Sequence, residues 1–220
     1  MSRLIRRVAV LFLTVGSAAL AQAQEKKAAG DSRELVADAG QTWNHFWNDP
    51  NLTWFRDHAR DALGFVIAPK VVKAGGRAIL VTRGEKSWNG PAFYSLGASS
   101  AGFSAGITVA EGIALVITQK GIDSLMSPSF KFGPDASVAI GPAGIGVGGS
   151  FTTDFVLFTR AKGLYGGVNV EGAAMTPTDD WNQEYYGRPV TPSEILKGDA
   201  RQAAAAGLLS TIARASRASK

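Results

Sequence analysis

Residues 64–96, GFVIAPKVVKAGGRAILVTRGEKSWNGPAFYSL, decide the fold class of this chain. Two short apolar segments, Phe65–Ile67 and Ala78–Val81, are β-like, and Glu85–Pro91 after them has the composition of a turn. Short apolar runs bounded by glycine and proline are typical of strands, and their apolar residues lack helical spacing. The stretch therefore predicts a β core.

Further β-like stretches follow at turn-bounded intervals, and helical patterns flank them. The β-like stretches are 107–118, 136–159 and 165–174. Helices are predicted within 31–62, as a pair broken near Asp49-Pro50, and at 120–126, 179–185 and 199–216, with a further start signal at Thr191-Pro192-Ser193-Glu194. We expect an α+β fold with an antiparallel, barrel-like β core and flanking N-terminal and C-terminal helices.

The N-terminus has the pattern of an export signal. Arg3, Arg6 and Arg7 precede an apolar run over 8–20, and Ala21-Gln22-Ala23 is a small-x-small cleavage site. The pattern predicts a signal peptide over 1–23. The polar residues 24–30 that follow it read as a flexible tail, and the last residues, 199–220, read as a basic C-terminal helix. The chain has no cysteine, so a lipid anchor at a cleavage-site cysteine is excluded. We expect a periplasmic or secreted protein.

Charge gives little support to nucleic-acid binding. The chain carries a formal charge of +5, and loss of the three leader arginines would leave +2. We therefore expect no nucleic-acid partner.

The pentapeptide GFSAG at 102–106 fits the nucleophile turn of serine hydrolases at Ser104. That turn requires a following helix, but Ile107-Thr108-Val109 is β-branched. The histidine base follows the serine in such proteins, whereas His45 and His58 precede it. A serine–lysine pair stays open, although no lysine stands out. We expect no catalytic residue.

The run at 144–149 satisfies G-x-G-x-x-G, but the residues after it read as a strand rather than the helix that a dinucleotide site needs. Two histidines and no cysteine exclude the usual zinc sites.

The carboxylates of Asp179, Asp180 and Glu184 have two interpretations. They are suitable ligands for calcium, or they complement the dipole of a short helix at its start. We expect no metal and no cofactor.

An aromatic helical segment contains Trp43, Trp47 and Trp54. The segment over 31–62 is acidic, with a charge near −3 from six acids and three arginines, so an anionic membrane would repel it. Packing against the β core is the favoured interpretation. The alternative is that these tryptophans form a surface for an envelope protein partner.

A basic cluster lies between Pro69 and Trp88. It comprises Lys70, Lys73, Arg77, Arg83 and Lys86. There are two interpretations of this cluster. One is a set of solvated charges in turns; the other is a binding site for an anionic lipid headgroup, with Trp88 at the membrane interface.

Four stretches resemble the SYLF domain, also called the Ysc84 actin-binding domain. They are GFVIAPKVVKAGG (64–76), NGPAFYSLGASSAGFSAG (89–106), GPDASVAIGPAG (133–144) and RAKGLYGGVNVEGAAM…DDWNQEYYGRPVTPSEIL (160–196). The resemblance covers about 31–198. Two departures are a shortened glycine-rich segment after Lys73, and Ser104 and Thr108 at positions where glutamine is expected.

The resemblance implies a non-enzymatic lipid-binding domain. Eukaryotic members bind phosphoinositide membranes, and some bind actin. Because actin cannot be the partner of an exported bacterial protein, the resemblance implies binding to phospholipids or to a membrane surface for this chain. We expect Lys70, Lys73, Arg77 and Lys86 to bind headgroups, and the aromatic rings of Trp88 and Phe93 to enter the interface. The alternative function is a structural or protein-interaction module of the cell envelope.

Overall fold

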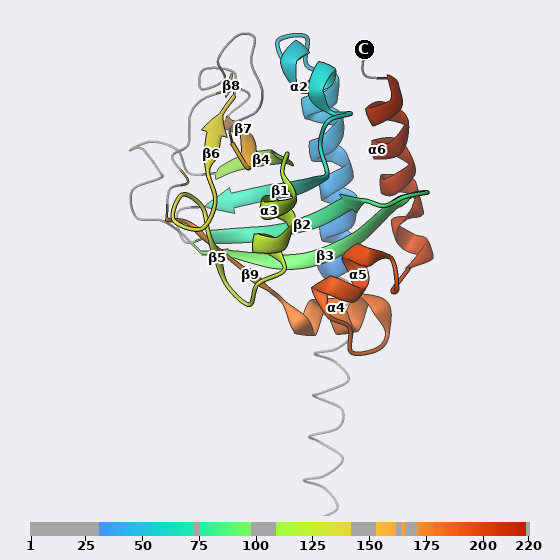
Figure 1. Ribbon diagram of the computed structural model, residues 1–220. Helices are drawn as coiled ribbons and strands as arrows, with labels where there is room; N and C mark the ends of the chain where they lie inside the picture. The colour runs from blue at the N-terminus through green and yellow to red at the C-terminus, as the bar shows by residue number, and fades with distance from the viewer. Residues whose placement is uncertain are drawn as a thin grey trace, which may run out of the picture.

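The computed structural model describes residues 31–72, 75–97, 109–141, 153–161, 164–165, 170 and 172–218 (Figure 1). The predicted signal peptide and tail, Lys73, Ser104 and the glycine run at 144–149 lie outside these residues. Within the described part of the chain, no helix is both long and apolar enough to cross a bilayer.

Nine strands form one sheet among the described residues. They are β1 (Gly64–Val72), β2 (Gly75–Arg83), β3 (Trp88–Gly97), β4 (Val109–Val116), β5 (Phe130–Lys131), β6 (Val138–Ile140), β7 (Phe155–Ala161), β8 (Leu164–Tyr165) and β9 (Ala174–Pro177). The order is β5-β9-β3-β2-β1-β4-β7-β6, with β8 on β7. Among these described strands, β6 pairs with β7 in parallel and the other pairs are antiparallel.

The predicted α+β class with an antiparallel, barrel-like core is therefore confirmed, but the barrel is a half-barrel. In the described part of the sheet, β5 and β6 end the order without pairing with each other. These end strands pair over only two and three residues respectively.

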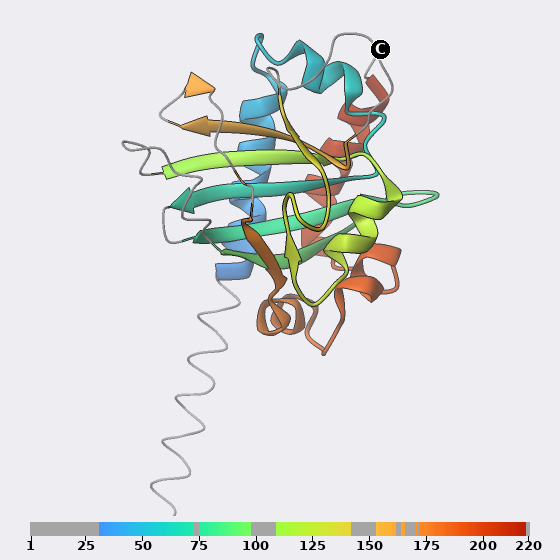
Figure 2. The same ribbon diagram turned by 60° about the vertical axis from the view of Figure 1, so that its left-hand side comes forward.

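Both faces of the sheet are covered, and each face has its own apolar core. Phe65 and Ile67 of β1 face residues 31–47, which are helical, together with α2 (Thr53–His58) and α6 (Ala206–Ala218). Val66 and Ala68 face the other way, toward α3 (Gln119–Leu125) and α5 (Pro192–Lys197). Figure 2 shows α3 in front of the strands, with the 31–47 helix and α6 behind them.

Local signals set the helix ends. Thr191 and Glu194 form the predicted capping box at the start of α5, and Gly198 ends the helix in the left-handed conformation. Gly187 ends α4 (Asp179–Tyr186) in the same way. The helix pair within 31–62 and the helix near 120–126 are also confirmed.

The predicted start of the last helix at residue 199 is wrong. The backbone amides of Asp199 and Ala200 donate hydrogen bonds to the Glu194 carbonyl, so these residues cap the C-terminal end of α5 instead of starting the next helix. The Gln202 side chain then caps a 3-10 turn at Ala203–Ala205, and α6 follows. This helix docks on the domain, because Leu208 and Ile212 belong to the core that the 31–47 helix covers.

Candidate functional site

Two of the predicted headgroup residues are neighbours across the first hairpin. Lys70 on β1 and Arg77 on β2 are paired in the strand register. Lys70 is exposed, whereas the Arg77 guanidinium lies 4.1 Å from the ring centroid of Trp181 and 3.4 Å from the Thr178 hydroxyl. Arg77 is therefore held against α4 rather than extended into solvent.

Carboxylates share this location. Lys70 and Arg77 line a cleft of about 480 Å³ together with Asp31, Glu34 and Asp38 of the 31–47 helix. Three carboxylates against two cations make this cleft an unfavourable place for an anionic phosphate.

Lys86 lies at the opposite end of β2, in the turn that leads into β3. The six residue steps from Arg77 to Arg83 span about 20 Å of extended strand, so Lys86 is separated from Lys70 and Arg77. The structure thus divides the basic cluster of the sequence into two locations. Lys73 is outside the described residues.

Lys86 instead faces the C-terminal region across a cleft of about 430 Å³. Arg201 and Arg217 line this cleft with it, and no carboxylate is among the described residues that line it. We call it the cationic cleft. Its remaining walls come from the β2–β3 turn and from one face of α6, with Ser87, Trp88, Asn89, Gly90, Gln202, Ala203, Ala206, Leu209, Ser210 and Ala213.

The three cations of the cationic cleft are available to a ligand. All three side chains are exposed, and none forms an ion pair with a described carboxylate. Arg201 only donates to the Gly198 carbonyl of its own turn, at 3.3 Å. The cleft is therefore lined by three cationic groups that no described carboxylate neutralises.

The predicted interface aromatics are both buried, so their expected exposure is wrong. Phe93 is 0% exposed and packs 5.0 Å from the ring of Tyr185, while Trp88 is 7% exposed and stacks on Phe65 at 5.2 Å. The physical reason is that helices cover the face of the sheet toward which both rings point. Only part of Trp88 reaches the cationic cleft.

The tryptophans of the N-terminal segment belong mainly to the same core. Trp43 is 0% exposed, and Trp47, which is half-buried, stacks on it at 5.8 Å. Trp54 is also half-buried and stacks on His58 at 4.1 Å. Packing on the β core is the confirmed interpretation for Trp43, which is inaccessible to a partner protein.

One charged cluster ties the 31–47 helix to the sheet edge. Glu111 of β4 lies 2.7 Å from Arg160 of β7, 3.1 Å from His45 and 3.2 Å from the Thr42 hydroxyl. These contacts of Glu111 join β4 to β7 and to the 31–47 helix, which is the role of a structural link. The His58 ring nitrogen lies 2.8 Å from the Trp54 carbonyl oxygen, one helical turn earlier.

The acidic residues of α4 fit the helix-dipole interpretation. Asp179 and Asp180 lie in the first turn, where the partial positive charge of the helix end favours them. In the described residues, no group of three or more histidine, cysteine or acidic side chains is placed to hold a metal ion.

Comparison with known proteins identifies the family to which this chain belongs. A family profile described as "Ysc84: Las17-binding protein actin regulator" matches residues 97–215, more than half of the chain. This chain belongs to the Ysc84 family. The profile match covers α4, α5 and α6 as far as residue 215; of the three cations of the cationic cleft it includes Arg201, whereas Lys86 and Arg217 lie outside it.

Curated relatives of this Ysc84 domain are longer proteins. LAS seventeen-binding protein 3 of Saccharomyces cerevisiae is 27% identical over 137 residues, which are 59% of this chain and 30% of the yeast protein. SH3 domain-containing YSC84-like protein 1 of Homo sapiens is 25% identical over 142 residues, covering 62% of this chain and 40% of the human protein. The chain thus spans less than half the length of these relatives.

Sequence reasoning missed Arg201 and Arg217 as site residues of the Ysc84 domain. The available signal was that residues 201–220 carry four cations and no acid. This composition predicted a basic helix. Which other cations lie near that helix depends on how α6 packs beside β3, and the sequence does not show this.

Proposed function

We propose that this Ysc84 domain binds the surface of anionic phospholipid membranes without catalysis, and that the cationic cleft holds the headgroup phosphate. The observation that carries the proposal is the grouping of Lys86, Arg201 and Arg217 in one cleft whose described lining has no carboxylate. Family membership supports a binding role. The Lys70–Arg77 location is the weaker candidate, since Asp31, Glu34 and Asp38 share its cleft.

Anionic vesicles are expected to capture the protein, and removal of the three cations is expected to release it. Each cation near an anionic surface contributes about 1 kcal/mol, so replacing Lys86, Arg201 and Arg217 with alanine should weaken binding by roughly a hundredfold. Flotation with vesicles of phosphatidylcholine alone, and of equal parts phosphatidylcholine and phosphatidylglycerol, measures this. Binding should also fall as salt is added.

The matched control removes three exposed lysines elsewhere, Lys70, Lys131 and Lys197. This variant has the same net charge as the cleft variant and should keep most of the vesicle binding. Equal losses in both variants would show that total charge, rather than the cleft, governs binding. Absence of wild-type binding to the phosphatidylglycerol vesicles would refute the proposed function itself.

Export is part of the proposal, and its support is the sequence pattern of residues 1–23. We expect the protein in a bacterial expression host to appear in the periplasmic fraction and to begin at Gln24. N-terminal sequencing of the purified protein tests this. Recovery of the intact leader from the cytoplasmic fraction would contradict it.

A further inference from the structure

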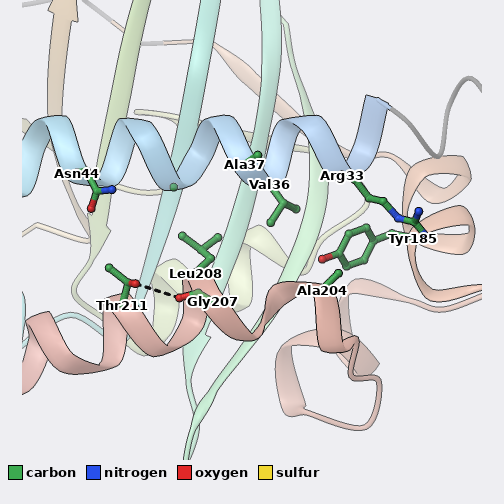
Figure 3. Close-up of a pocket in the computed structure, with 10 residues that line it drawn as sticks. Arg33, Val36, Ala37, Asn44, Tyr185, Ala204, Gly207, Leu208 and Thr211 are labelled. Carbon is green, nitrogen blue, oxygen red and sulfur yellow. Dashed lines mark hydrogen bonds between the residues drawn. The ribbon is translucent and has the colours of Figure 1, made fainter.

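The 31–47 helix and α6 run side by side in the same direction, with a groove of about 320 Å³ between them (Figure 3). Arg33 and Tyr185 lie at one end and Asn44 and Thr211 toward the other. We call this the helix groove. Its remaining lining residues are small or apolar: Val36, Ala37, Gly40, Ala204, Gly207 and Leu208.

Two glycines on the facing helices keep the groove open. A Cβ atom added at Gly40 or at Gly207 would meet no atom within 4 Å. Neither glycine is required for close packing of the two helices, and neither has a positive φ. The space above them is therefore available to a ligand.

The Tyr185 hydroxyl is the observation that points to a ligand. The residue is 4% exposed, its oxygen has no hydrogen-bond partner among the described residues, and the hydroxyl points into the helix groove between Val36 and Ala204 (Figure 3). Buried hydroxyls usually have a partner, so this one is a donor without an acceptor. Burial raises the pKa of Tyr185 to about 12, opposed by the nearby charge of Arg33, so the hydroxyl stays protonated at neutral pH.

The chemistry of the two ends defines the ligand. Arg33 and Tyr185 provide a cation and a hydroxyl donor at one end, and no acidic residue is among the described residues that line the groove. Between Arg33 and Asn44 the helical rise gives a length of about 16 Å along a largely apolar wall. This arrangement fits an amphiphile with one anionic head and one apolar chain.

We propose that the helix groove binds a single fatty acid of about twelve carbons, whose extended length matches that of the groove. Its carboxylate accepts the hydrogen bond from Tyr185 and pairs with Arg33, and its chain lies over Gly40 and Gly207. The volume of about 320 Å³ accommodates one chain rather than the two chains of a phospholipid. The cationic cleft lies on the opposite face of α6, so this binding is independent of the vesicle surface.

Calorimetric titration of delipidated protein with dodecanoate tests the proposal. The wild type should bind about one dodecanoate per chain, and dodecanol should bind much more weakly because it lacks the charge. Tyr185→Phe should weaken dodecanoate binding about tenfold or more, since it removes one hydrogen bond to a charged group. Gly40→Leu combined with Gly207→Leu fills the groove and should abolish binding.

Ser210→Leu is the matched control, because it adds the same side chain to α6 on the face of the cationic cleft. It should bind dodecanoate like the wild type, and circular dichroism should show that every variant is folded. The glycine variant should still float with anionic vesicles, which separates this proposal from the proposed function. Absence of wild-type binding, or binding by the folded glycine variant, would overturn the fatty-acid site.

Discussion

Replacement of Trp43 with alanine is expected to lower the free energy of unfolding by about 3–5 kcal/mol, the range for large aromatic residues in a core. The Trp43 side chain is 0% exposed. Its ring lies 4.8 Å from that of Phe65 on β1 and 5.7 Å from that of Phe55 on α2. It therefore joins the 31–47 helix to the sheet and to the next helix, and alanine would leave a cavity among all three.

Urea denaturation followed by circular dichroism measures this loss. Trp43→Phe should cost much less, since it keeps an aromatic ring and removes a buried indole N–H that has no hydrogen-bond partner in the described part of the chain. Trp47→Ala is the control on the same helix; its half-buried side chain should give a smaller loss. A Trp43→Ala protein within about 1 kcal/mol of the wild type would contradict the central position of this ring.

Replacement of Asp154 with alanine is expected to cost about 3 kcal/mol, because it removes the acceptor of a buried network. Asp154 is 6% exposed. Its carboxylate accepts from the Thr118 hydroxyl at 2.5 Å and from both the amide and the hydroxyl of Ser137 at 2.9 Å, and Lys120 lies 3.5 Å away. Thr118 also caps α3, so the network joins that helix to the start of β7.

The same network predicts an acid dependence of stability. Burial acts to raise the pKa of Asp154, but the hydrogen bonds from Thr118 and Ser137 outweigh it and lower the pKa below its usual value. The folded state therefore favours the carboxylate. Its stabilisation is present above about pH 4, the ordinary pKa of aspartate, and is lost as the pH falls through the lowered value.

Denaturation of the wild type and of Asp154→Asn between neutral pH and about pH 3 tests this dependence. The difference in unfolding free energy between the two proteins should be largest near neutral pH and should shrink in acid. Ser127→Ala, a half-buried serine outside the network, serves as the control that should follow the wild type at every pH. A difference that stays constant with pH would rule out the ionised carboxylate as its source.

The sequence was most informative where structure depends on neighbouring residues. Thr191, Pro192 and Glu194 predict the start of α5 because a capping box is closed within one turn. Apolar segments such as 78–81 predict strands for the same local reason. The start of α6 was misjudged because two contacts hold residues 199–203 in another conformation: the Glu194 carbonyl, which precedes the predicted helix, accepts from Asp199 and Ala200, and the Gln202 side chain accepts from the amide of Ala203.

The candidate site was harder to predict, because it combines residues far apart in the chain. Lys86 and Lys70 are close in sequence, yet a strand of nine residues separates their locations. Lys86 and Arg217 are far apart in sequence and line one cleft. Trp88 and Phe93 were expected at the membrane interface because they lie close in sequence to the basic cluster and because the resemblance implies lipid binding. Both rings are instead buried in the core that the 31–47 helix and α6 cover.

By itself, the sequence determined the α+β class, most of the helices and strands, and the likeness to one family. Each of these depends on the spacing of nearby residues or on motifs that are continuous in the chain. Only the tertiary structure decided which charges act together. In the folded protein, Lys70 and Arg77 line a cleft together with carboxylates of the 31–47 helix, whereas Lys86 lines a cleft together with Arg201 and Arg217. The physical reason is that α6 docks through Leu208 and Ile212 on the core, and this packing fixes the direction of its cations.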